Sequence, residues 1–232
     1  MPTWVWHAKP RDSYVMGSVE ADDNACLAAS MLMIDYGWTL EACCGMFGSI
    51  NYEGGWNPWR WQDDNIRSVS QAQTTSAGYG LIGWTPAKKY LFNNATFEYQ
   101  GHTYQYFPNY NQEGYPGYGP NFSDRTGLPT DGAAQIKLIG EGMQASNTSI
   151  WYDRKGCSAR NYIHLTDVTR AAYYWGYNAE YSAHIDESIR GRENAARAWH
   201  QHMIDMGFDP SPGSNMPIWL MAKVSQSFLN KN

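Results

Sequence analysis

An apolar stretch that ends in a single carboxylate constrains this chain more than any other feature. The stretch reads LEACCGMFGSINYE and runs from Leu40 to Glu53. Its apolar residues recur every three or four positions, which is the spacing of one buried helix face. Thr39 can cap the start of this helix, and the two glycines after Glu53 can end it. The pattern therefore predicts a buried helix that carries Glu53 at its C-terminal end.

The position of Glu53 suits a general acid. Hydrolysis of a glycosidic bond needs an acid that is protonated when the substrate binds and that protonates the leaving oxygen. The negative end of the helix dipole and the nearby side chains of Met46, Trp56 and Trp84 would both disfavour an ionised carboxyl there. The alternative is a plain surface residue, which is the more common role of a glutamate at a helix end. The sequence alone therefore makes Glu53 a candidate catalytic residue and no more.

A second carboxylate could act as base, nucleophile or stabiliser of the transition state. Asp63 and Asp64 follow in the polar segment 59–77, which we expect to be a loop beside the cleft. The alternative interpretation is a solvated acidic loop with no catalytic role. A mechanism that uses Glu53 alone, with assistance from the substrate, also fits the sequence.

Aromatic residues make up 15% of the chain, with 11 Trp and 17 Tyr, while charged residues make up only 17%. Aromatic rings stack on the apolar faces of sugars and keep their polar edges in water, so this composition is typical of a glycan-binding protein. A core that happens to be built from aromatic residues is the other explanation. For the rings near Glu53 we favour sugar contacts.

The net charge of −5 argues against a nucleic acid as partner. No apolar run approaches the roughly 18 residues of a membrane span, and the N-terminal segment does not have the pattern of a signal peptide. The cysteine and histidine spacings match no metal site, so we expect neither a metal nor a cofactor. A disulfide between Cys26 and Cys43 is left open.

Periodicity and capping residues outline the rest of the chain. We expect a single domain over residues 1–232, with a core at about 20–206, an aromatic insert at 94–130 and a C-terminal tail at 208–232. The expected elements are helices at 25–36, 132–143, 166–175 and 186–206, a strand at 79–84 and a hairpin within the insert.

Several short motifs resemble those of the phage tail lysozyme family, which belongs to the lysozyme and lytic transglycosylase superfamily. They include GWTLEA at 37–42, GMFG at 45–48, Glu53 itself, Asn57-Pro58, GYGLI at 78–82 and WTPA at 84–87. The resemblance implies an α+β, lysozyme-like fold, mainly helical, with a small β-hairpin that lines a substrate cleft.

The resemblance also implies roles for particular residues. Glu53 matches the catalytic acid of the family, Asn57 lies on the loop after the acid, and Tyr79 and Trp84 lie on the strand that lines the cleft. The predicted substrate-binding residues are Trp56, Asn57, Tyr79 and Trp84. The chain departs from the family pattern at Gly54, where a serine is usual, and at Gly83, where a glutamine is usual.

The leading hypothesis is therefore a phage muramidase that hydrolyses the β-1,4 bond between MurNAc and GlcNAc in bacterial peptidoglycan. A lytic transglycosylase on the same fold and a non-catalytic cell-wall-binding tail protein are the alternatives. We expect the protein in the phage tail of the virion or in the host cell at lysis, with other phage tail proteins as further partners.

Overall fold

A computed structural model describes residues 4–8, 13–53, 55–62, 71, 74–87, 96–99, 101–105, 129–145, 150–180 and 184–209. Asp63, Asp64 and the C-terminal tail from residue 210 onward lie outside this described part. The chain divides into two compact units, each assembled from separate segments. The first contains Met1–Val5, Ala25–Tyr52 and Ile136–Asn232, and the second contains Trp6–Asn24 and Glu53–Gln135. The single domain over residues 1–232 stays a prediction.

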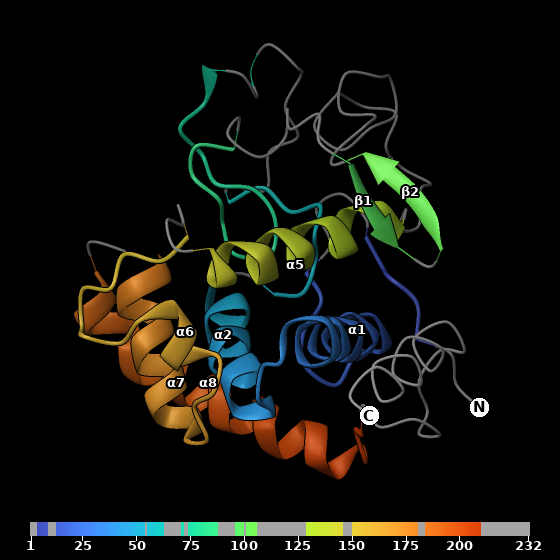
Figure 1. Ribbon diagram of the computed structural model, residues 1–232. Helices are drawn as coiled ribbons and strands as arrows, with labels where there is room; N and C mark the ends of the chain where they lie inside the picture. The colour runs from blue at the N-terminus through green and yellow to red at the C-terminus, as the bar shows by residue number, and fades with distance from the viewer. Residues whose placement is uncertain are drawn as a thin grey trace. The chain divides into compact units, whose positions relative to one another are not determined.

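The described part of the chain is mainly helical, as the sequence predicts (Figure 1). The helices are α1 (Val19–Tyr36), α2 (Leu40–Glu53), α5 (Pro129–Gln144), α6 (Ala159–Tyr162), α7 (Val168–Trp175) and α8 (Ile185–Asp205). A π-helical turn, η2 (Gly176–Glu180), directly extends α7. Within the described residues, no helix combines the length and the apolar character that crossing a membrane requires.

Helix α1 begins earlier than the sequence predicts. The sequence predicts this helix at 25–36, but it starts at Val19. The Ser18 hydroxyl accepts a hydrogen bond from the backbone N–H of Ala21 at 3.2 Å, so the cap lies upstream of the predicted start. The predicted end is confirmed, because α1 stops at Tyr36, directly before a glycine with positive φ.

Helix α2 has the predicted bounds and the predicted cap. The Thr39 hydroxyl accepts a hydrogen bond from the backbone N–H of Ala42 at 3.1 Å. The helix then ends at Glu53. The residues Ala42–Ile50 are all buried, which confirms that α2 is a core helix with its carboxylate at the C-terminal end.

Two glycines let α2 pack closely against α7 and α8 in the first unit. A Cβ at Gly45 would lie 2.5 Å from the Cβ of Ala171 on α7. A Cβ at Gly48 would lie 2.3 Å from the backbone oxygen of Arg192 on α8. Both distances are shorter than any real Cβ contact, so a larger residue at either position would force the helices apart.

An aromatic cluster forms much of the core of the first unit. Trp38, Trp151, Tyr162 and Trp175 are all buried, and five ring pairs among them have centroids 4.8–6.2 Å apart. The hydroxyl of Tyr162 donates to the backbone oxygen of Ala42 on α2 at 2.7 Å. For these four rings, the interpretation as core residues is the one that the structure supports.

The four cysteines, all of which lie in the described part of the chain, are buried and form no disulfide bond. The bridge between Cys26 and Cys43 is therefore absent. Burial raises the pKa of the Cys43 and Cys44 thiols well above their ordinary value, because an apolar interior disfavours a thiolate.

The predicted strand at 79–84 is wrong, and these residues form a tight turn. Tyr79 and Trp84 exchange two backbone hydrogen bonds of 3.1 and 3.0 Å, and the chain reverses between them. Gly80 and Gly83 adopt positive φ angles of 84° and 58°, which an extended strand does not contain. The glycines therefore mark a reversal of the chain at this point.

The insert contains a short antiparallel hairpin formed by β1 (Thr96–Tyr99) and β2 (His102–Gln105) (Figure 1). Its register pairs Thr96 with Gln105 and Tyr99 with His102. Residues 106–128, which form most of the aromatic insert, lie outside the described part. A position of this hairpin beside a substrate cleft stays a prediction.

Candidate active site

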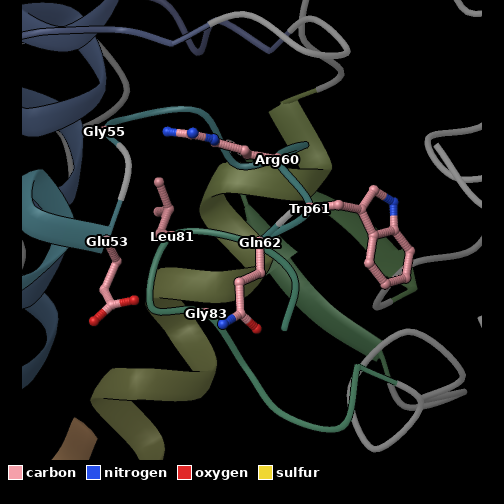
Figure 2. A pocket seen from close by; sticks show the side chains of 8 residues that line it. Glu53, Gly55, Arg60, Trp61, Gln62, Leu81 and Gly83 are labelled. Carbon is pink, nitrogen blue, oxygen red and sulfur yellow. The ribbon is translucent and has the colours of Figure 1, made fainter. Parts of the chain in front are cut away.

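Glu53 opens onto a small surface depression in the second unit (Figure 2). About 290 Å³ of empty space lies in the depression and in the open solvent at its mouth. Its lining residues are Glu53, Gly55, Arg60, Trp61, Gln62, Gly80, Leu81 and Gly83. Glu53 is exposed, so the expectation that apolar rings would withdraw its carboxyl from water is not met in this structure.

The loop that follows Glu53 is held by a buried asparagine. The Asn24 amide donates to the backbone oxygen of Trp56 at 2.7 Å and to that of His7 at 2.8 Å, and its oxygen accepts from the His7 N–H at 2.8 Å. The N–H of Trp56 in turn donates to the backbone oxygen of Tyr14 at 3.0 Å. Asn24 is fully buried, so these hydrogen bonds form away from competing water.

A second buried amide, that of Gln135 on α5, joins the two loops of the depression. Its nitrogen donates to the backbone oxygen of Pro58 at 2.7 Å, and its oxygen accepts from the backbone N–H of Leu81 at 2.8 Å. Gly80 makes room for this arrangement, because a Cβ there would lie 2.4 Å from the Gln135 amide oxygen. The side chain of Gln135 thus links the loop after Glu53 to the turn at 79–84 and fixes the distance between them.

The four predicted substrate-binding residues all have buried side chains. The exposed fraction is 0% for Trp56 and Asn57, 1% for Tyr79 and 4% for Trp84. Asn57 makes a local turn, because its side-chain oxygen accepts a hydrogen bond from the Trp59 N–H at 3.0 Å. In this conformation the contacts of these residues are structural, and a direct role in sugar binding stays a prediction.

The two predicted carboxylate partners of Glu53, Asp63 and Asp64, lie outside the described residues. Their catalytic role therefore stays a prediction. Among the residues that the structure describes, no group of three or more His, Cys, Asp or Glu side chains is arranged to hold a metal ion.

Two polar residues of the depression, Arg60 and Gln62, are absent from the predicted site. They belong to the segment Trp59-Arg60-Trp61-Gln62, in which both tryptophans are buried, Arg60 is half-buried and Gln62 is exposed. This alternation of buried and exposed residues is the period-two pattern of an extended segment packed on one face. The signal is present in the sequence, but we had assigned the whole of 59–77 to an irregular loop.

The segment around Gln62 pairs with the residues that lead into the turn at 79–84. The Gly80 N–H donates to the Arg60 backbone oxygen at 2.8 Å, and the Gln62 N–H donates to the Gly78 backbone oxygen at 3.0 Å. The Trp61 and Tyr79 rings pack together with their centroids 4.9 Å apart. The depression is therefore framed by two segments that are hydrogen-bonded to each other.

Comparison with known proteins shows the family to which this chain belongs. The profile of the phage tail lysozyme family matches residues 23–203, which cover most of the chain. The chain belongs to this family. Its mainly helical structure is consistent with a lysozyme-like fold.

A curated relative is similar over a shorter region. Morphogenesis protein 1 of Bacillus phage B103 is 42% identical over 59 residues. This region is 25% of the present chain and 14% of the relative, so the chain corresponds to a small part of that protein.

Proposed function

We propose that the protein is a phage peptidoglycan-cleaving enzyme, a muramidase, in which Glu53 is the general acid. The observation that carries the proposal is the exposed Glu53 carboxyl at the edge of a depression, in a chain of the phage tail lysozyme family. The substrate bond is the β-1,4 linkage between MurNAc and GlcNAc. Peptidoglycan is accordingly the proposed partner.

In the proposed reaction, the protonated Glu53 carboxyl gives its proton to the oxygen that bridges the two sugars. The bond between this oxygen and the anomeric carbon of MurNAc breaks, and GlcNAc leaves as an alcohol. A water molecule then adds its oxygen to the anomeric carbon and releases a proton to a base. We assign this second part of the reaction to Asp63 or Asp64, which stay the candidate bases.

The hydrogen bonds around the depression support the role of Glu53 as the general acid. A general acid needs to lie within hydrogen-bond reach of the leaving oxygen, so the substrate has to be held in a defined position. Asn24 and Gln135 hold the loop that follows Glu53 through the backbone oxygens of Trp56 and Pro58. Both amides are fully buried, so their hydrogen bonds keep this loop in one conformation. In the proposal, the substrate therefore binds to a rigid loop beside the acid.

Product analysis tests the reaction. Purified sacculi would be incubated with the protein in water enriched in oxygen-18, and the soluble fragments would be analysed by mass spectrometry. A muramidase releases fragments with reducing MurNAc ends that carry one heavy oxygen from the solvent. Ends of the 1,6-anhydro type would show a lytic transglycosylase instead, and binding to sacculi without any release would show a non-catalytic wall-binding protein.

We further propose that the protein acts in the phage tail of the virion or in the host cell at lysis. The family and the phage origin of the morphogenesis protein support a role in the phage cycle. Mass spectrometry of purified virions tests the location. The presence of the protein in virions at a fixed copy number supports a role as a tail component. Its absence from virions supports a role at lysis.

A further inference from the structure

The side chain of Gln62 is held in place although it is exposed. The backbone N–H of Gln62 donates to the Gly78 oxygen at 3.0 Å, and the Gln62 side-chain oxygen accepts from the Gly78 N–H at 3.0 Å. Two hydrogen bonds to Gly78 thus restrain the backbone of Gln62 and the amide at the end of its side chain. An exposed glutamine normally has several rotamers, so such restraint lowers the entropy cost of binding a ligand through its amide.

These contacts also decide which way the amide group faces. The Gly78 N–H is a donor, so the group that it meets has to be the side-chain oxygen of Gln62. The amide nitrogen then faces away from Gly78 with its two N–H donors. In Figure 2 this nitrogen lies on the side toward Glu53, and Gly83 lies between the two side chains.

Gly83 leaves open the space between Gln62 and Glu53. A Cβ built at Gly83 would meet a carboxyl oxygen of Glu53 at 4.0 Å, and no other atom of the described residues beyond its chain neighbours comes as close. The positive φ of 58° at this position disfavours a side chain. The depression therefore presents a carboxyl and an amide donor across a gap that none of the described residues fills.

We propose that Gln62 is a substrate-binding residue whose amide nitrogen donates a hydrogen bond to a neutral oxygen of the sugar beside Glu53. The inference rests on the proposed function, because it assumes that this depression takes a glycan. Hydroxyl and acetamido oxygens of a sugar are both neutral acceptors, and both fit an amide donor. Gln62 would thereby orient the sugar at the acid without taking part in proton transfer.

Binding of a soluble oligosaccharide tests this role separately from catalysis. The parent protein carries Glu53→Gln, which stops turnover, and chitotetraose is the probe in calorimetric titration. Adding Gln62→Glu keeps an oxygen for the Gly78 N–H and removes the amide donor. We expect about tenfold weaker binding of chitotetraose, the size of one hydrogen bond lost from a binding site.

Two further variants control for charge and for folding. Gln71 is also exposed and lies outside the lining of the depression, so Gln71→Glu in the same parent is expected to leave the affinity unchanged. Gln62→Met removes the donor without adding a charge and should weaken binding like Gln62→Glu. Thermal unfolding followed by circular dichroism shows whether each variant is folded.

A second ligand distinguishes the two kinds of acceptor. Cellotetraose has the same β-1,4 backbone and no acetamido groups. Weaker binding of chitotetraose alone supports an acetamido acceptor, and weaker binding of both ligands supports a hydroxyl acceptor. Unchanged affinity in the folded Gln62 variants overturns the proposal, as does a complete lack of binding by the parent.

The outcomes for Gln62 and for the enzyme are separable. If the wild-type protein cleaves sacculi and the Gln62 variants bind and cleave like it, the inference fails while the proposed function stands. If the wild-type protein cleaves nothing but binds chitotetraose through Gln62, the proposed function fails while the inference stands.

Discussion

The guanidinium of Arg192 on α8 lies over the ring of Tyr52, with 4.9 Å between its Cζ atom and the ring centroid. Arg192 is 1% exposed, and its Nε–H donates to the Ser188 hydroxyl at 3.3 Å. Tyr52 is the residue directly before Glu53 in α2. The contact therefore holds the last turn of the helix that carries the candidate acid.

Replacement of this arginine tests the contribution of the contact. We expect Arg192→Met to lower the free energy of unfolding by about 1–2 kcal/mol, because a cation–π contact between a buried guanidinium and a half-exposed ring is lost. Urea denaturation of the purified protein measures this change. The matched control is Arg197→Met, since Arg197 lies on the same helix and is exposed. Equal stability of the two variants would contradict the importance of the Arg192 contact.

The buried amide of Gln135 offers a test of how the depression is held. In Gln135→Leu, the Leu81 N–H and the Pro58 oxygen lose their partner, and we expect a loss of about 2–4 kcal/mol in the free energy of unfolding. Hydrogen exchange of the Leu81 amide should also become faster. The control is Gln144→Leu on the same helix, where the side chain is exposed and gives up one hydrogen bond, to the backbone oxygen of Tyr36 at 3.3 Å. Unchanged exchange at Leu81 would argue against the role of Gln135.

The close packing of α2 predicts that Gly48→Ala destabilises the protein. Alanine is a better helix former than glycine by about 1 kcal/mol, but its Cβ would lie 2.3 Å from the Arg192 backbone oxygen. We expect the clash to dominate, with a net loss of about 1–3 kcal/mol in chemical denaturation. The neighbouring Ser49→Ala, also buried in α2, should cost much less. A stabilised Gly48→Ala protein would show that the helices have room to move.

The buried thiols predict a particular pH dependence. Burial raises the pKa of Cys43 and Cys44 in the folded protein, so the unfolded chain releases these protons at lower pH than the folded one. Stability from these thiols is therefore fully present below the ordinary thiol pKa of about 8.5 and declines as the pH rises beyond it.

Denaturation between about pH 7 and pH 10 measures this decline. The wild-type protein should lose stability more steeply with rising pH than the double variant Cys43→Ala/Cys44→Ala. Ellman's reagent should react with neither thiol in the folded protein and with both after unfolding in guanidinium. Identical slopes for the two proteins, or rapid reaction of Cys43 or Cys44 in the folded state, would contradict the assignment.

Local signals in the sequence correctly predict α2 and the position of Glu53 at its end. A cap at Thr39, an apolar stripe and a glycine stop all lie within one short segment, so helix, bounds and carboxylate follow from neighbouring residues. The predicted start of α1 is wrong because both a serine and an aspartate in this segment are residue types that cap helices. Ser18 takes the capping position, and Asp22 lies inside the helix.

The features that the sequence did not predict depend on contacts between distant residues. Gln62 belongs to the depression because it pairs with Gly78, 16 positions further along the chain. The turn at 79–84 depends on the positive φ angles of Gly80 and Gly83, where the sequence pattern predicts a strand. Burial of Trp56 and Trp84 likewise follows from tertiary packing, which composition alone does not reveal.

The most direct test of the central claim compares wild-type protein and Glu53→Gln on purified peptidoglycan sacculi. The rate of release of soluble fragments is measured, with circular dichroism to show that the variant is folded. Loss of a general acid slows a reaction by about 10²–10⁴-fold, and we predict a decrease of at least this size. Glu141→Gln, which changes an exposed carboxylate outside the depression, should keep wild-type activity. Release by a folded Glu53→Gln variant at a rate close to that of the wild-type protein would contradict the account.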